Sequence, residues 1–175
     1  MILSRTQSFF LLLLLLTSPF VAADDAKQAN KEDTKPFEMS KQERRLLELV
    51  NKERAKANLP ELRPHPLLFK AARAHSANMA KQRKMEHILD GKRPSQRVEA
   101  TGYDWGKVTE NLITADQSDV PLEKIVKGWM DSKIHRDNIL MKDVTETGLG
   151  IATNAKDDIY FTQLFARQRK IKSGN

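Results

Sequence analysis

The sequence predicts an α+β fold, a three-layer α-β-α sandwich in which helices cover both faces of one sheet. Four segments have the apolar periodicity or the end signals of helices, at residues 40–58, 66–84, 94–101 and 121–132. Two strands are expected on either side of a turn, at residues 147–153 and 159–165 with the turn at 154–158. The second of these strands is apolar on both faces, and such a strand needs helices on both sides of its sheet.

The first two helices have clear start signals. Ser40 and Glu43 form a capping box at the start of the first helix, and Asn58 suits the left-handed conformation that ends it. The second helix opens at a proline, so His65 before it is either a surface residue or a cap. We interpret His75 as a hydrogen-bonded core residue rather than a ligand, because it shares the apolar face of this helix with Leu68, Ala72 and Met79.

The middle of the chain predicts a short helix, a strand and a longer helix. Gly102 stops the short helix over 94–101. The strand over 108–114 carries Glu110, and the helix that follows buries Trp129 as a core anchor.

In the last strand, Gln163 shares a face with two phenylalanines. A buried amide needs partners, so Gln163 either borders a polar cleft or bonds to a neighbouring loop.

Residues 1–23 are typical of a secretory signal peptide. Arg5 gives a positive start, residues 9–16 are apolar, and small residues offer a cleavage site before Asp24. The apolar run of 8 residues is short of the roughly 20 that a membrane-spanning helix needs, so no transmembrane span is expected after signal removal. The chain has no cysteine, which excludes a cysteine-linked lipid anchor and leaves the core to stabilise the domain without disulfides.

Three further segments follow the signal. Residues 24–39 are expected to form a flexible charged linker, residues 40–167 the domain, and residues 168–175 a basic tail. The expected location is secreted, periplasmic or associated with the cell envelope. The net charge of +7 indicates either a mixed-charge surface or attraction to acidic polymers, and no specific nucleic-acid motif accompanies it.

Two histidines and a glutamate in separate segments are the candidate site, namely His87, Glu110 and His135. If the fold gathers them, His87 and His135 are the candidate ligands of zinc or another divalent metal, with water in an open position. Glu110 would then be a third ligand or a general base. Without metal, the same side chains form a hydrogen-bonded polar cluster that shapes a ligand cleft, which is the interpretation we favour. Ser132 lies near His135 in the sequence, which is poor evidence for a catalytic pair.

Several stretches in a fixed order extend this pattern: LVNKER at 49–54, AARAHSANMA at 71–80, His87, ENL at 110–112, Trp129-Met130 with Ser132 and 135–140, TGLG at 147–150 and YFTQLF at 160–165. With these stretches, the chain from about Leu46 to Ala166 resembles the CAP superfamily (cysteine-rich secretory proteins, antigen 5 and pathogenesis-related-1), also called the SCP domain. It looks most like the compact bacterial branch that lacks disulfides.

This resemblance implies an α-β-α sandwich with a central cleft that holds two histidines and two acids. The residues that match are His87, Glu110 and His135. The second acid of the family has no clear match, although Asp131 lies nearby. Thr109 and Ile134 replace the family's glycines before the Glu-Asn pair and before the second histidine.

Three functions are therefore open. The first is a non-enzymatic extracytoplasmic module that binds a lipid or other small hydrophobic ligand, a divalent metal, an envelope component or a protein partner, as the resemblance implies. The second is a divalent-metal-dependent hydrolase that acts on peptides or envelope material, with Glu110 as its catalytic residue. The third is an electrostatic binder of acidic polymers.

Overall fold

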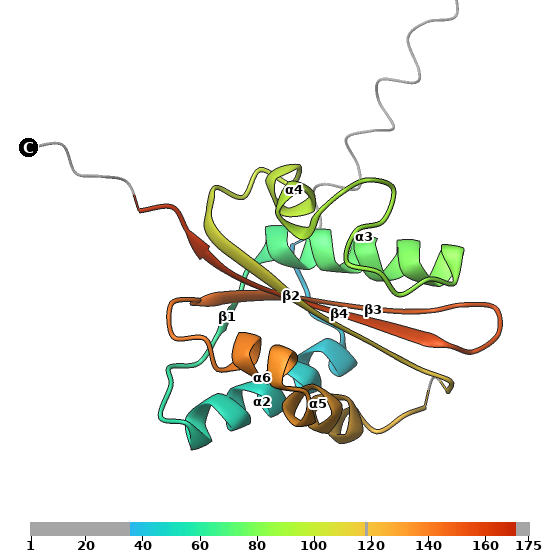
Figure 1. Cartoon of the computed structure of the whole chain (residues 1–175), viewed down its shortest axis with the longest axis horizontal. Coiled ribbons are helices and arrows are strands. Elements are labelled where there is room, and N and C mark those ends of the chain that lie inside the picture. Colours follow the sequence, from blue (N-terminus) through green and yellow to red (C-terminus); the bar gives the residue numbers. More distant parts are fainter. Residues whose placement is uncertain (1–35, 118, 171–175) are drawn as a thin grey trace, which may run out of the picture. The chain divides into compact units, whose positions relative to one another are not determined.

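A four-stranded sheet lies between two layers of helices in the computed structural model, which describes residues 36–117 and 119–170 (Figure 1). The strands are β1 (Arg63–Pro64), β2 (Trp105–Ala115), β3 (Glu146–Thr153) and β4 (Ile159–Gln168), and their order in the sheet is β1-β3-β4-β2. β1 pairs with β3 in parallel, and the other pairs are antiparallel. Within the described ranges β2 pairs with β4 alone, so it forms one edge of the sheet.

Two helices cover one face of the sheet and three cover the other (Figure 1). The first pair is α3 (Pro66–Gln82) and α4 (Pro94–Glu99), and the other three are α2 (Lys41–Lys56), α5 (Leu122–Asp131) and α6 (Lys133–Ile139). Leu164 of β4 packs with Leu68 of α3, whereas Phe161 of β4 packs with Trp129 of α5. We call the two sides the α3 face and the α6 face. The predicted three-layer α-β-α sandwich is confirmed.

The helix ends follow the predicted chemistry closely. At the start of α2 the Ser40 hydroxyl accepts from the Glu43 amide at 3.1 Å, and the Ser40 amide donates to the Glu43 carboxylate at 2.7 Å, which is the predicted capping box. Asn58 has a φ of 55°, in the left-handed region. His65 caps α3, because its Nδ1 accepts from the Leu67 amide at 3.3 Å. α3 ends at Gln82, slightly before the predicted end at residue 84.

The helix α6 was not predicted, and it carries His135. Ser132 has φ −86° and ψ 123°, an extended conformation that ends α5 and lets α6 start at the next residue. The sequence hides this break because α6 has only 7 residues and because Ile134, an apolar residue, is 74% exposed on its solvent side. Apolar periodicity cannot identify a short helix whose apolar residues point both inward and outward.

Two glycines of β3 let α3 lie against the sheet backbone. A Cβ atom on Gly148 would overlap the carbonyl carbon of Leu68, and one on Gly150 would overlap the carbonyl oxygen of Ala72. Any side chain at these positions would push α3 away from the sheet. The close approach fixes the position of α3 and therefore of His75, which lies one turn beyond this contact.

The N-terminal signal at 1–23, the linker up to residue 35 and the tail from residue 171 lie outside the described residues. Residues 37–39, at the end of the expected linker, contact the domain. The Phe37 ring lies 5.0 Å from the Phe69 ring, and Arg73 donates to the Glu38 carbonyl at 2.7 Å. Among the described helices, none combines the length and apolar character needed to cross a membrane.

Candidate functional site

Glu110 is a buried carboxylate on the edge strand β2. Its cross-strand neighbour on β4 is Leu164, which packs against α3, so Glu110 also points to the α3 face. Only 1% of its side chain is exposed. A charged group at this depth needs charged or polar partners, because desolvation otherwise disfavours its ionised form.

Two side chains from the segment between α3 and β2 supply those partners. His87 Nδ1 lies 2.9 Å from Glu110 Oε1, and Arg97 Nη2 donates to Glu110 Oε2 at 2.6 Å. Arg97 Nη1 also donates to the carbonyl of His87 at 2.9 Å, so the arginine fixes both the carboxylate and the backbone of the histidine. We call His87, Arg97 and Glu110 the β2-edge cluster.

The contact with Glu110 also decides which nitrogen of His87 faces outward. A carboxylate only accepts hydrogen bonds, so Nδ1 of His87 carries the proton and donates. In the neutral ring, Nε2 is then an acceptor, and it has no hydrogen-bond partner among the described residues. The side chain of His87 is 54% exposed. The cluster therefore presents an oriented imidazole acceptor to the solvent.

His75 anchors the segment that carries His87. It is 1% exposed, and its Nε2 lies 3.0 Å from the carbonyl of Glu86, the residue before His87. A carbonyl only accepts, so Nε2 is the protonated nitrogen. Burial is the main cause that lowers the pKa of His75, and the charge of Arg97 acts in the same direction. The interpretation of His75 as a hydrogen-bonded core residue is confirmed.

His135 approaches the same strand from the α6 face. The Asn111 side chain donates to the carbonyl of His135 at 2.9 Å, and Asn138 donates to the Asn111 side-chain oxygen at 2.9 Å. Asn138 also donates to the carbonyl of Glu110 at 3.3 Å. These amide bonds tie α6 to β2 beside the cluster. Burial, followed by the nearby charge of His87, lowers the pKa of His135. The chain thus brings His87 and Glu110 into contact and His135 into their vicinity.

The donor set does not fit a zinc site with three protein ligands. Among the described residues, no three His, Cys, Asp or Glu side chains are placed to hold a metal ion. Both oxygens of Glu110 are already bonded, and one of them lies 2.6 Å from the guanidinium of Arg97. A positive charge at that distance opposes a second cation at the same carboxylate.

Arg97 is the site residue that sequence reasoning missed. The helix that carries it was predicted, but its length of 6 residues gives no reliable face. The available signal was indirect, because a glutamate in an apolar strand needs a cation nearby. Asp131, the acid considered for a second cleft position, is instead an exposed residue of α5 paired with Lys127 at 2.5 Å.

Gln163 is fully buried on the α6 face. Its amide nitrogen donates to the Thr147 hydroxyl of the neighbouring strand at 3.3 Å. Its partner lies on a strand, so the expected bond to a neighbouring loop is wrong, and its side-chain oxygen has no hydrogen-bond partner among the described residues. Trp129 is a core anchor as predicted, because it is 0% exposed and donates to the Leu112 carbonyl at 3.2 Å.

A sequence model of the cysteine-rich secretory protein family, CAP, matches residues 47–165. The chain belongs to the CAP family. This CAP domain contains no cysteine, as in the disulfide-free bacterial branch. Over 126 residues it is 31% identical to the YkwD protein of Bacillus subtilis strain 168, and the match covers 71% of this chain and 48% of YkwD. This CAP chain therefore spans about half the length of that relative.

Solved structures show the same fold. An outer surface protein from Borrelia burgdorferi is 21% identical with a TM-score of 0.69, and the match covers 76% of this chain and 97% of the Borrelia protein. An extracellular protein with an SCP domain from Bacillus anthracis is 21% identical with a TM-score of 0.62, over 83% of this chain and 50% of that one. At this level of identity the likeness concerns the CAP fold, and the chemistry must be argued from the residues of this chain.

Proposed function

We propose that this chain is an extracytoplasmic CAP-domain module that binds a small amphipathic ligand in a cleft bordered by His87, Glu110 and His135. The bonding of Glu110 carries the proposal. A general base needs a free lone pair within reach of the proton it removes. The Glu110 side chain is only 1% exposed, and both its oxygens accept hydrogen bonds from the same chain, so a substrate proton is out of its reach and the carboxylate orients His87. This arrangement supports binding rather than chemistry.

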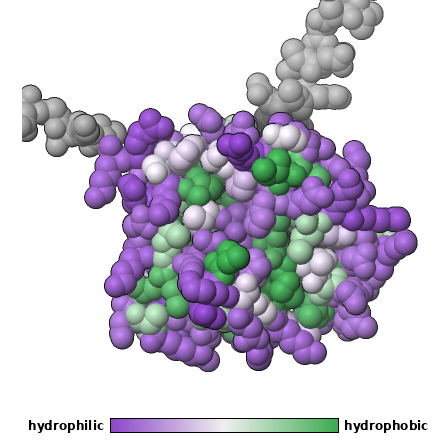
Figure 2. Space-filling view, viewed as in Figure 1, coloured by the Kyte–Doolittle hydropathy of each residue, from purple (hydrophilic) through white to green (hydrophobic). Residues whose placement is uncertain are grey.

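The side chains around the two histidines indicate the ligand class. Met85 and Ile88 flank His87 and are 45% and 52% exposed, and Ile134, next to His135, is 74% exposed. Figure 2 shows the side of the domain on which α6 and β2 are nearest to the viewer in Figure 1. This side is largely hydrophilic and carries separate apolar areas. Each histidine thus has exposed apolar residues close to it in the chain, and ligand sites combine apolar walls with a few polar groups in this way. A lipid-like molecule with hydroxyl groups would contact the apolar residues and donate to the imidazole of His87.

The extracytoplasmic location is supported by the signal pattern at residues 1–23, which lie outside the described ranges. Two solved structures with this fold are described as an outer surface protein and an extracellular protein. An envelope lipid, or a lipid-like part of a partner protein, is then within reach of the cleft.

The binding proposal can be tested by NMR titration of the full chain with dihexanoyl phosphatidylglycerol below its micelle concentration. We expect saturable shifts of the His87 and His135 ring signals, and a weaker affinity in Ile134→Ser, because that change removes apolar contact area. Lys133→Ser is the matched control, since it alters the neighbouring exposed residue of α6. Ring signals that do not respond, or an equal loss in the control, would contradict the proposal.

A metal-dependent hydrolase makes a different prediction. It requires tight zinc binding that is lost in both His87→Ala and His135→Ala, and peptide or ester hydrolysis that is lost in Glu110→Gln. We expect a zinc titration by calorimetry to show no tight site in the wild-type chain, because Arg97 occupies the position beside Glu110. Tight zinc binding that depends on both histidines would contradict the binding module and support a metal centre.

A further inference from the structure

A second pocket lies on the α3 face, between α3, α4 and the segment that joins them. Its volume is about 330 Å³. Arg97 is the one residue of the β2-edge cluster among its lining residues, which are Lys70, Ala71, Ala74, His75, Asn78, Leu89, Asp90, Lys92, Arg97, Ala100 and Thr101. This pocket is distinct from the proposed cleft, and it shares one side chain with the β2-edge cluster.

Two buried nitrogens of the lining residues have no hydrogen-bond partner among the described residues: Nδ1 of His75 and Nε of Arg97. His75 is 1% exposed, and the side chain of Arg97 is 10% exposed. Buried polar atoms of this kind are costly unless something bonds to them. Neither atom takes part in the bonds that hold His87 and Glu110, and each belongs to a side chain that lines the pocket.

The roles of the two nitrogens follow from their other bonds. Nε2 of His75 donates to the Glu86 carbonyl, and burial keeps the pKa of this histidine low, so Nδ1 is an unprotonated acceptor. Nε of Arg97 always carries a hydrogen and is a donor. A simple carboxylate cannot satisfy both, because it only accepts. A secondary amide satisfies both, since its N–H donates and its C=O accepts.

The remaining lining residues add apolar walls and a positive charge. Leu89 and three alanines leave space for a small acyl group. Lys70 and Lys92 are cationic, and Arg97 is already paired with Glu110. Asp90 is the single acid of the lining and is bonded to the side chains of Asn78 and Gln82. This excess of positive charge suits a ligand that carries a carboxylate.

We propose that the α3–α4 pocket binds an N-acylated amino acid, with its amide between His75 and Arg97 and its carboxylate near Lys70 and Lys92. A free acyl amino acid and the N-acylated, carboxylate-bearing unit of a larger envelope molecule share this chemistry. Because Arg97 also holds Glu110 and the His87 carbonyl, an occupant of the pocket would stabilise the β2-edge cluster from behind.

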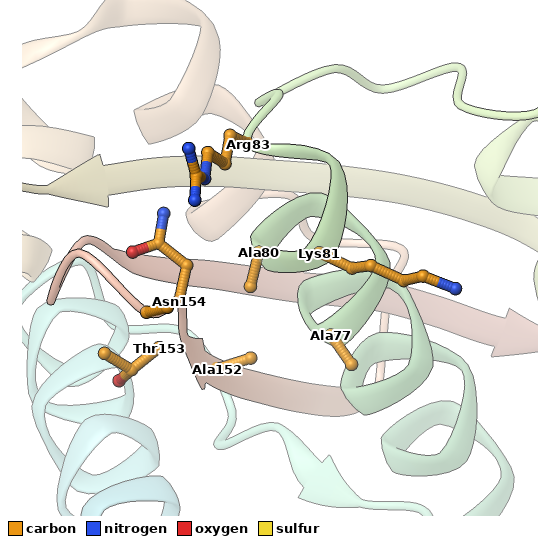
Figure 3. A pocket seen from close by; sticks show the side chains of 8 residues that line it. Ala77, Ala80, Lys81, Arg83, Ala152, Thr153 and Asn154 are labelled. Carbon is orange, nitrogen blue, oxygen red and sulfur yellow. The ribbon is translucent and has the colours of Figure 1, made fainter.

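A neighbouring hollow provides the comparison. It lies between the end of α3 and the turn between β3 and β4, and Figure 3 shows its side chains, with Lys81 pointing away from Asn154. Its volume is about 380 Å³, yet none of its lining residues has a buried polar atom without a partner. Ala77 of this hollow and Ala74 of the α3–α4 pocket are both exposed alanines of α3, so they form a matched pair for substitution.

The test is an NMR titration of the full chain with N-acetylalanine, observed at the ring nitrogens of His75 and at Nε–H of Arg97. We expect both signals to shift in a saturable way. Butyrate lacks the amide and N-acetylalanine methylamide lacks the carboxylate, so each should bind about tenfold more weakly, which is the size of one charge-assisted hydrogen bond. Lactate, whose hydroxyl also donates and accepts, tests the amide requirement. N-acetylmuramic acid tests an envelope source, with N-acetylalanine as the free form.

Two substitutions separate the pocket from the rest of the surface. Ala74→Leu should obstruct the pocket and abolish the shifts, whereas Ala77→Leu should leave them unchanged. Lys70→Gln should weaken binding, and Lys81→Gln on the same helix should not. Unchanged His75 and Arg97 signals, equal responses to butyrate or lactate, or equal losses in the paired variants would overturn the proposal. The phospholipid titration is observed at His87 and His135, so its failure is distinguishable from failure here.

Discussion

Glu43 and Glu110 are both buried carboxylates that bind an arginine, but only Glu110 also binds a histidine. The Glu43 side chain is 5% exposed, and it accepts from Nε and Nη2 of Arg73, both at 2.7 Å, and from the Ser40 amide. All of these partners serve the junction between α2 and α3. The side chain of Glu110 is 1% exposed, and its second partner is His87, whose side chain is 54% exposed.

This difference identifies the candidate site better than burial or charge does. Each carboxylate is nearly inaccessible, and each has a charged partner on a different element. At Glu43 every partner belongs to the junction between α2 and α3, so the pair stabilises the fold. At Glu110 the chain of bonds ends on an oriented ring that faces the solvent, so the same kind of pair prepares a group for contact with a ligand.

The largest expected effect is that of Arg97→Met. It removes the charge that faces Glu110 and leaves a buried carboxylate with His87 alone, so we expect a loss of about 3–5 kcal/mol in the free energy of unfolding. Urea denaturation at pH 7 measures this loss. The double variant Arg97→Met/Glu110→Leu should recover part of it, because no unpaired charge remains. A loss below about 1 kcal/mol would mean that water already reaches Glu110.

Arg73→Met should have a smaller effect, although its geometry is bidentate. The Arg73 side chain is 41% exposed, so water can replace part of its contact with Glu43, and the Ser40 amide still donates. We expect a loss of about 1–2 kcal/mol by urea denaturation. A loss larger than that of Arg97→Met would reverse the comparison between the two carboxylates.

The pH dependence of stability tests the contacts of Glu43 with Arg73 and Ser40. Burial alone would raise the pKa of Glu43, but the hydrogen bonds from Arg73 and Ser40 outweigh it and hold the pKa below the ordinary value of 4.5. A folded-state pKa below the unfolded one gives stability that is present above pH 4.5 and is lost as the pH falls through the folded-state pKa. The free energy of unfolding of the wild type should therefore decrease as the pH falls below 4.5, and that of Glu43→Gln should decrease less steeply.

The sequence predicts the parts of this fold that depend on local patterns. The capping box at Ser40, the left-handed Asn58 and the turn at 154–158 follow from the residues themselves. The three layers follow from the apolar faces of the last strand. The glycines of β3 are visible in the sequence, but only the structure shows that the backbone of α3 packs against them.

The candidate site was predictable only in part, for a physical reason. His87 and Glu110 stand out as residue types in their local sequence, whereas Arg97 is one of many basic residues and becomes special through its burial beside Glu110. The helix that carries His135 was missed because its stability comes from contacts with β2 rather than from its own pattern. Roles that depend on long-range contacts cannot be assigned from local sequence.

Asn138→Ala tests those long-range contacts. Asn138 donates to the Asn111 side chain and to the Glu110 carbonyl, so its loss leaves buried acceptors without partners. We expect a loss of about 1–2 kcal/mol in unfolding free energy and a shift of the His135 ring signals, since among the described residues only the bond from Asn111 to the His135 carbonyl then remains between α6 and β2. The contacts of Glu43 with Arg73 and Ser40 should be unaffected. If the His135 signals stay in place, the bond from Asn111 and the apolar contacts hold α6 without Asn138.

Lys133→Ala is expected to have the smallest effect. Lys133 and Asp137 form an i,i+4 pair at 2.6 Å on the outside of α6, with side chains 78% and 56% exposed. Exposed pairs of this kind contribute only about 0.3–0.5 kcal/mol. The urea midpoint should move little, and the His135 signals should not move. A loss as large as that of Asn138→Ala would show that the surface pair, and not the amide bonds to β2, determines where α6 and His135 lie.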